Sequence, residues 1–239
     1  MSISRRKLMT VSGAALAGLS VVGGQSKRSE AQQAGAEVEN WPDSLVEQEL
    51  RAGFPADLPL LADGSAPEHE PSEAGPIEGP LMWRTPDRQT PTYINPDYRQ
   101  MAIRVDTRGM GRLRGTLRFR DLDALPEVTQ TYLLQCGAPV PRGIVSWTGV
   151  RFADFADMLG LNPGVHYCRF TAADGHYVDE DLTTLTRSQV MLAWGMNGDP
   201  IPADHGAPLR LVIPFRYGNR SIKAITSMLF STPGLPPPA

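Results

Sequence analysis

Four polar side chains in the C-terminal part of the sequence are the residues best suited to bind a charged group. His205, Arg210, Ser221 and Lys223 lie in one block, residues 191–225, which has the pattern of a polar hairpin, a buried strand and a donor-rich turn. They could converge on one anion, because a Gly-x-x-Ser turn presents backbone N–H groups beside two cations. The turn does not open a helix, so the pattern does not indicate a nucleotide phosphate.

The sequence contains two cysteines, and their surroundings differ. Cys136 follows an apolar stretch that predicts a strand, whereas Cys168 has no comparable context and is interpreted as a buried structural residue. A disulfide between the two is one alternative in an oxidising compartment. A zinc site is another, formed by both cysteines with His166 and His176, although the spacing matches no recognised zinc motif.

Several common signatures are missing from the 239 residues. The sequence has no G-x-S-x-G nucleophile motif, no phosphate-binding P-loop, no C-x-x-C-H haem motif and no H-E-x-x-H zinc motif. A formal net charge of −3 argues against a nucleic-acid-binding protein. Two cysteines are too few for a disulfide-dense scaffold or for an iron–sulfur cluster held by four thiolates.

The first 31 residues have the composition of an export signal. Arg5 and Arg6 precede a mildly apolar stretch, residues 8–22, which is too short to span a membrane. This order is typical of a bacterial twin-arginine signal peptide; the alternative is a basic N-terminus that is not a signal. The twin-arginine export machinery carries folded proteins, usually because a cofactor is inserted before export. The sequence therefore predicts a periplasmic cofactor enzyme.

An acidic, proline-rich stretch follows, and residues 32–80 are predicted to form a solvated arm or linker. Residues 37–80 contain eleven acidic residues and one basic residue, Arg51, a composition that does not favour a core. The remaining residues, 81–239, have 17 basic and 14 acidic residues. The arm is either a solubilising tail, or it covers a basic cofactor site or docks a basic partner.

The elements that must position these residues are short. Hydrophobic patterning and proline positions predict strands over 100–106, 113–119, 129–135, 166–172, 209–214 and 221–230, and helices over 119–126 and 152–159. Strands and helices alternate irregularly, without βαβ spacing throughout, so the fold class is α+β with a mixed β-sheet. We expect a single domain over residues 81–232 and a flexible tail over 233–239.

Three stretches of the sequence resemble the sulfite oxidase superfamily of molybdopterin enzymes. They are LLQCG at 133–137, VSWTGV at 145–150 and the block 191–225. The resemblance is strongest to small bacterial members of the type of the periplasmic methionine sulfoxide reductase catalytic subunit. It implies the molybdopterin-binding fold of that superfamily, a molybdenum–molybdopterin cofactor and oxidoreductase activity.

The resemblance also implies roles for individual residues. In the family, the cysteine that follows the strand ligates molybdenum, which implies Cys136 here; a soft thiolate suits such a metal. The cofactor-binding residues implied by the other motifs are Thr171, His205, Arg210, Ser221 and Lys223. Arg142 and Trp194 are the candidates for the substrate pocket, beside Cys136.

Two departures from the family pattern bear on the substrate. Sulfite oxidases continue after the cysteine with a small residue, Gly, Asn and Arg, whereas this chain reads GAPVPR over 137–142. They also place a tyrosine where this chain has Trp194. We therefore expect two-electron oxygen-atom transfer on a small sulfoxide-like or sulfur-oxyanion substrate. The alternatives are a sulfite dehydrogenase and a cofactor-free binding protein that kept the fold.

The electrons for this reaction would come from or go to another protein. No haem-binding module is recognised in the sequence, so the expected redox partner is a cytochrome or a membrane quinol-linked subunit. The other expected partner is the small-molecule substrate.

Overall fold

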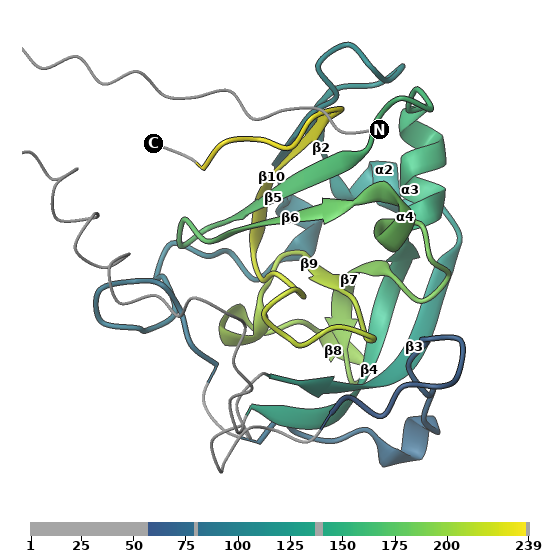
Figure 1. Cartoon of the computed structure of the whole chain (residues 1–239). Coiled ribbons are helices and arrows are strands. Elements are labelled where there is room, and N and C mark those ends of the chain that lie inside the picture. Colours follow the sequence, from purple (N-terminus) through teal and green to yellow (C-terminus); the bar gives the residue numbers. More distant parts are fainter. Residues whose placement is uncertain (1–56, 79–80, 137–140, 238–239) are drawn as a thin grey trace, which may run out of the picture. The chain divides into compact units, whose positions relative to one another are not determined.

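The computed structural model describes residues 57–78, 81–136 and 141–237, which form two β-sheets and several short helices (Figure 1). The predicted signal peptide, residues 1–31, and residues 32–56 of the predicted arm lie outside the described residues. Among the described residues, no helix has the length and apolar character needed to cross a membrane.

The first sheet is mixed, which confirms the predicted fold class. Its strand order is β2-β1-β10-β5-β6, and β1 and β10 run parallel while the other pairs are antiparallel. The strands are β1 (Ile103–Asp106), β2 (Gly115–Leu117), β5 (Tyr167–Ala172), β6 (Tyr177–Asp181) and β10 (Ile225–Ser231). A parallel pair needs a crossover connection, and here that crossover contains the whole second sheet.

The second sheet is antiparallel throughout. Its order is β3-β4-β7-β8, and β9 pairs with β7. The strands are β3 (Glu127–Gln135), β4 (Arg142–Arg151), β7 (Met191–Met196), β8 (Asp199–Pro200) and β9 (Arg210–Val212). The β3–β4 register continues to the pair Gln135–Arg142, so Cys136 leaves the sheet where this hairpin turns.

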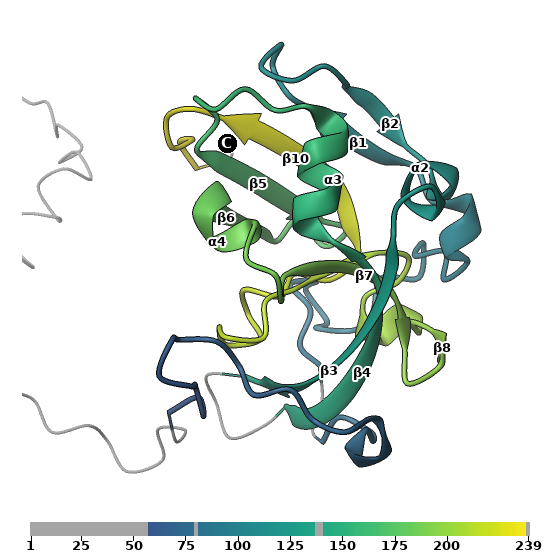
Figure 2. The ribbon, with the colours of Figure 1, turned by 90° about the vertical axis from the view of Figure 1, so that its right-hand side faces the viewer.

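Helix α3 (Phe152–Leu159) matches the predicted helix over 152–159 and lies across the first sheet (Figure 2). Its Phe152 ring lies 5.8 Å from Phe170 of β5 and 6.4 Å from Phe230 of β10. Gly160 ends the helix with a φ of 59°, a conformation that glycine adopts without strain. The remaining helices are α2 (Phe119–Asp123), α4 (Leu182–Leu185) and the 3₁₀ turns η1 (Pro71–Glu73), η2 (Tyr98–Gln100) and η3 (Ala203–His205).

Residues 57–78, within the predicted acidic arm, pack along the second sheet. Glu68 forms a β-bridge with Tyr132 of β3, and Glu78 forms one with the first residue of β4. Ala66 is buried, and its backbone N–H and C=O both bond the Gln189 side chain, at 2.9 and 2.8 Å. The free backbone groups of a strand edge can pair with an extended chain, so these residues are attached to the sheet, although most of residues 57–78 remain exposed as expected for a solvated arm.

The described part of the predicted flexible tail is also held in place. Arg169 is buried, and its guanidinium pairs with Asp179 at 2.6 Å. The same group donates to the carbonyls of Pro236 (2.7 Å) and Leu235 (3.1 Å). A guanidinium has five donors, so one buried arginine ties the tail to β5 and β6.

Candidate functional site

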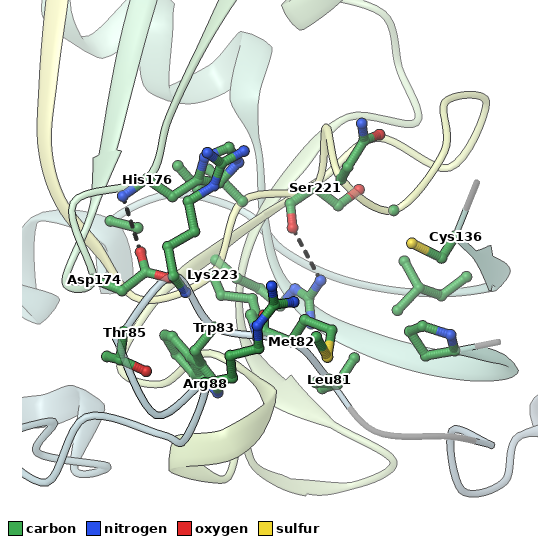
Figure 3. A pocket seen from close by; sticks show the side chains of 18 of the residues that line it. Leu81, Met82, Trp83, Thr85, Arg88, Cys136, Asp174, His176, Ser221 and Lys223 are labelled. Atoms are coloured by element: carbon green, nitrogen blue, oxygen red, sulfur yellow. Dashed lines mark hydrogen bonds between the residues drawn. The ribbon is translucent and has the colours of Figure 1, made fainter. Parts of the chain in front are cut away.

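A cavity of about 600 Å³ brings together several of the residues expected to do chemistry (Figure 3). It lies between the end of β3, the β5–β6 hairpin, the start of β9, the turn before β10, and residues 81–88, which we call the strap. The polar lining residues include Arg84, Arg88, Cys136, Asp174, His176, Arg210, Ser221 and Lys223.

Cys136 enters this cavity from the side of the second sheet. Its backbone N–H donates to the Pro141 carbonyl at 3.0 Å, which fixes the residue directly after β3. The thiol is free and partly exposed. Leu134 and Pro141 line the cavity too, so the described surroundings of the thiol along the chain are apolar.

The two cysteines are free, so the disulfide alternative is wrong. Cys168 lies on β5 with its side chain fully buried in the core, and this burial raises the pKa of its thiol well above the ordinary value. The zinc alternative is not supported either, because the described residues contain no group of three His, Cys, Asp or Glu side chains that could hold a metal.

A disulfide reagent should modify one of the two thiols in the native protein without cofactor. We expect Cys136 to react and Cys168 to react only after unfolding, since the reactive species is an accessible thiolate. Labelling with 5,5′-dithiobis(2-nitrobenzoic acid), followed by mass spectrometry of the peptides, measures both rates. Comparable rates in the native state would contradict the burial of Cys168.

Arg210, the first residue of β9, places a fully buried guanidinium behind the cavity. Its Nη1 donates to the carbonyl of His205 at 2.8 Å, and its Nη2 donates to that of Ser221 at 3.1 Å. The guanidinium lies 4.6 Å from the ring of Trp147, a cation–π contact. Its Nε has no hydrogen-bond partner among the described residues, and burial lowers the pKa of Arg210 to about 9. Within this part of the chain the guanidinium thus has spare donor capacity and no carboxylate partner.

Ser221 and Lys223 approach the cavity from the turn between β9 and β10. The Ser221 hydroxyl accepts a bond from the N–H of Ile213 at 3.0 Å, which leaves its proton free to donate. The Lys223 ammonium donates to the Met82 carbonyl at 3.0 Å. Burial and the nearby Arg210 charge lower the pKa of Lys223 to about 8. These groups give this end of the cavity hydrogen-bond donors and positive charge, which suit an anion.

Gly206 allows the backbone of Lys223 to lie directly against the backbone of residue 206. Its φ is 108°, and a Cβ placed there would lie 2.8 Å from the Lys223 Cβ. The neighbouring His205 is half-buried, its Nδ1 has no hydrogen-bond partner, and burial lowers its pKa. Any side chain at residue 206 would therefore push the lysine and its turn away from β9.

Gly206→Ala should lower the free energy of unfolding by about 1–3 kcal/mol, the usual range for forced backbone strain, and somewhat more if the lysine cannot move. The matched control is Gly198→Ala, since Gly198 has a φ of 88° but nothing near its missing Cβ. Urea unfolding of both variants separates strain from collision. Equal losses in the two variants would show that the contact with Lys223 is not tight.

Four of the residues expected at the site do not line this cavity. Trp194 lies on β7, where all six residues are buried, and its ring packs against Phe119 (5.3 Å) and Tyr98 (6.2 Å) in the core. Arg142 is exposed and donates to the Gln135 side chain at 3.3 Å. The other two are His205, which is adjacent through its carbonyl, and Thr171, whose carbonyl accepts from the Thr226 hydroxyl.

The cavity also contains residues that the sequence patterns did not assign. Trp83, Arg84 and Arg88 belong to the strap, whose sequence has no periodicity. Asp174 and His176 lie in the β5–β6 hairpin; the Asp174 carboxylate accepts bonds from the N–H of His176 (3.0 Å) and of Arg84 (2.8 Å) (Figure 3). The Asp-Gly pair that marks this turn was the available signal.

The sequence matches one family profile and several curated proteins. The profile of the oxidoreductase molybdopterin binding domain matches residues 90–234. A protein of Azospira oryzae with the provisional name protein-methionine-sulfoxide reductase subunit YedZ1 is 27% identical over 70% of this chain and 64% of its own length. The NADPH nitrate reductase of Fusarium oxysporum is 39% identical over 70% of this chain and 18% of its own.

The fold has a solved counterpart. The sulfane dehydrogenase SoxCD of Paracoccus pantotrophus superposes with a TM-score of 0.53 and 18% identity, covering 82% of this chain and 58% of that one. The chain spans less than two thirds of the length of the relatives described above. The match over residues 90–234 contains both sheets, so the chain belongs to the oxidoreductase molybdopterin-binding domain family, within the sulfite oxidase superfamily.

Proposed function

We propose that this protein is an exported molybdopterin oxidoreductase that transfers an oxygen atom to or from a small sulfoxide-like substrate, with Cys136 as the metal ligand. The observation that carries the proposal is the cavity itself. It combines a free thiol with a buried arginine, a serine and a lysine (Cys136, Arg210, Ser221, Lys223). A thiol suits a soft metal centre, and the cationic side chains suit a phosphate.

The residues present fit the family's cofactor. A molybdopterin carries its metal at one end and a phosphate at the other. The cavity contains the free thiol of Cys136 and, on another segment, the turn between β9 and β10 with the Lys223 ammonium (Figure 3). The Nε of Arg210, which lines the cavity, is buried without a hydrogen-bond partner among the described residues. Orphaned buried polar atoms are rare in folded proteins, so this one supports a bound group in the cavity.

The four residues named above have separate roles in the proposed function. The Cys136 thiolate would hold the metal, while Arg210, Lys223 and the Ser221 hydroxyl would hold the phosphate. When bound, the cofactor supplies two-electron oxygen-atom exchange at molybdenum. Leu134 and Pro141, which line the cavity on either side of Cys136 in the chain, would limit the access of water to the thiolate.

The proposed substrate class follows from the surroundings of Cys136. Leu134 and Pro141, which are near Cys136 in the chain, are apolar, and the exposed Arg142 bonds Gln135; the cations of the cavity are Arg84, Arg88, Arg210 and Lys223. A neutral sulfoxide loses less hydration free energy than sulfite in such surroundings. The relative from Azospira oryzae is named for methionine sulfoxide reduction, which also supports this class.

The proposal is tested on protein produced with its own N-terminus in a host that makes molybdopterin. We expect molybdenum and released pterin in equal amounts with protein, and reduction of methionine sulfoxide by an artificial electron donor. Sulfite oxidation with an artificial acceptor, without sulfoxide reduction, would instead make the protein a sulfite dehydrogenase. Correctly folded protein that contains neither molybdenum nor pterin would overturn the proposed function.

Export and electron transfer complete the proposal. We infer export of the folded protein by the twin-arginine route, because Arg5 and Arg6 precede the short apolar stretch. Electrons would come from a separate cytochrome or quinol-linked protein. Changing both arginines to lysine should leave loaded protein in the cytoplasm, which fractionation and a molybdenum measurement can show; export of that variant would contradict the route.

Anion binding at Lys223 should weaken as the pH rises. The lysine pKa is lowered to about 8, so its ammonium is mostly charged at pH 7 and mostly neutral at pH 9. We expect sulfate, whose own charge is constant over this range, to raise the unfolding midpoint of the cofactor-free protein less at pH 9 than at pH 7. Lys223→Arg should restore part of the effect at pH 9, because a guanidinium keeps its charge to a higher pH than an ammonium in the same place. A pH-independent sulfate effect in the native sequence would argue against Lys223 as the anion ligand.

A further inference from the structure

The strap, residues 81–88, lies outside the part of the chain that matches the family profile, yet it forms one wall of the cavity. Figure 3 shows Trp83 and Met82 directly beside Lys223. Trp83 is 3% exposed, which is unusual for an indole in a segment without helix or strand. Such deep burial of a large ring in a loop indicates that the ring has a role in the adjoining site.

The contact between Trp83 and Lys223 is close. The Lys223 ammonium lies 3.8 Å from the centre of the Trp83 ring, well within the range of a cation–π interaction. The same ammonium donates one hydrogen bond to the Met82 carbonyl. An ammonium has three donors, so two remain for a ligand while the ring and the carbonyl fix its position.

Two of the contacts between the strap and the site involve this lysine, through Met82 and Trp83. A third is the bond from the Arg84 N–H to the Asp174 carboxylate. A lysine side chain has four rotatable carbon–carbon or carbon–nitrogen bonds before its ammonium and loses much entropy when it is ordered. A group that orders the ammonium before the ligand arrives reduces the entropy cost of binding.

We propose that Trp83 is a positioning residue that holds the Lys223 ammonium in place for the phosphate of the cofactor. This inference rests on the proposed function for the identity of the ligand. Trp83 acts through the lysine, and this role requires no direct contact between Trp83 and the ligand. The strap is therefore a part of the cofactor site that the family profile does not include.

The test compares Trp83→Leu with Trp83→Phe. Leucine removes the ring face, whereas phenylalanine keeps an aromatic ring in the same place. A partly buried cation–π contact is worth roughly 1 kcal/mol, so we expect Trp83→Leu to lose pterin about five- to tenfold faster than the native sequence. Trp83→Phe should stay within about twofold. The readout is protein-bound pterin, measured by fluorescence at intervals after dilution of purified loaded protein, and it does not require turnover.

A matched control and a double variant separate positioning from general destabilisation. Phe215→Leu removes another ring that faces a cation, Arg187 at 4.0 Å, and Phe215 does not line the cavity; it should retain pterin as the native sequence does. Lys223→Gln should lose pterin faster, and adding Trp83→Leu to it should cause no further loss. Additive losses in the double variant, or native retention in Trp83→Leu, would overturn the proposal.

A second measurement works on protein without cofactor and keeps the two proposals apart. Trypsin can cut the strap after Arg84 and Arg88. If the lysine contact fastens the strap, Trp83→Leu and Lys223→Gln should both speed these cuts, while Phe215→Leu should not. Equal cutting rates in all variants would overturn the strap contact itself. Native protein that contains no pterin would overturn the proposed function, and the trypsin rates would still report on Trp83 and Lys223.

Discussion

Cys136→Ser is expected to remove molybdenum from the protein and to lower oxygen-atom transfer by more than about 100-fold, since changes to outer-shell partners alone cost 10–100-fold. A serine hydroxyl is a hard, weakly acidic ligand, whereas the cysteine thiolate is soft and ionises far more easily. The backbone of residue 136 is fixed by the bond to Pro141, so the serine oxygen occupies the same place with the wrong chemistry. Elemental mass spectrometry and sulfoxide turnover measure the two losses.

Cys168→Ala is the matched control for this variant. Cys168 is fully buried on β5 and does not line the cavity. Its replacement by alanine should lower stability slightly and leave the molybdenum content unchanged. Native molybdenum content together with native turnover in Cys136→Ser, or loss of metal from Cys168→Ala alone, would show that Cys136 is not the metal ligand.

Arg210→Met should empty the site of cofactor while changing the stability of the cofactor-free protein little. Burial lowers the Arg210 pKa to about 9, so keeping the guanidinium charged inside the protein costs free energy. The guanidinium also makes two charge-assisted bonds, to the carbonyls of His205 and Ser221, worth roughly 1.5–3 kcal/mol each. Because these contributions oppose each other, methionine should change the free energy of unfolding by less than about 2 kcal/mol.

Two measurements on the same variant check this balance. Urea unfolding of cofactor-free protein gives the change in stability, and pterin content after expression in a competent host gives the loss of binding, which we expect to exceed about tenfold for a buried charged partner. A loss of stability above about 4 kcal/mol with normal pterin content would make Arg210 a structural residue.

The sequence predicted the parts of the fold that have a clear period. Helix α3 was placed correctly because Phe152 and Phe155 repeat at helical spacing and Gly160 ends the helix. β7 was not predicted as a strand, because all six of its residues are buried and show no alternation. β4 was missed for a related reason, because its burial does not alternate along the strand. β6 was also missed, although its burial alternates.

The candidate site was predictable where side-chain chemistry and sequence motif coincide. Cys136, Arg210, Ser221 and Lys223 were named from the sequence, and all four line one cavity. Trp194 was expected there because it replaces a polar family residue, yet an indole on a fully buried strand packs into the core. The strap could not be found this way, since Trp83 meets Lys223 only through a tertiary contact that no spacing along the chain encodes.

The contacts that build the cavity join very distant parts of the chain. The bond between Lys223 and the Met82 carbonyl closes a loop of 141 positions, and the lining combines Cys136, next to the second sheet, with Asp174 and His176 from the first. Contacts of such separation are among the last to form during folding. We therefore expect the cofactor to bind only after both sheets have formed, because either sheet alone would supply only part of the lining. Opening either sheet would release that group again.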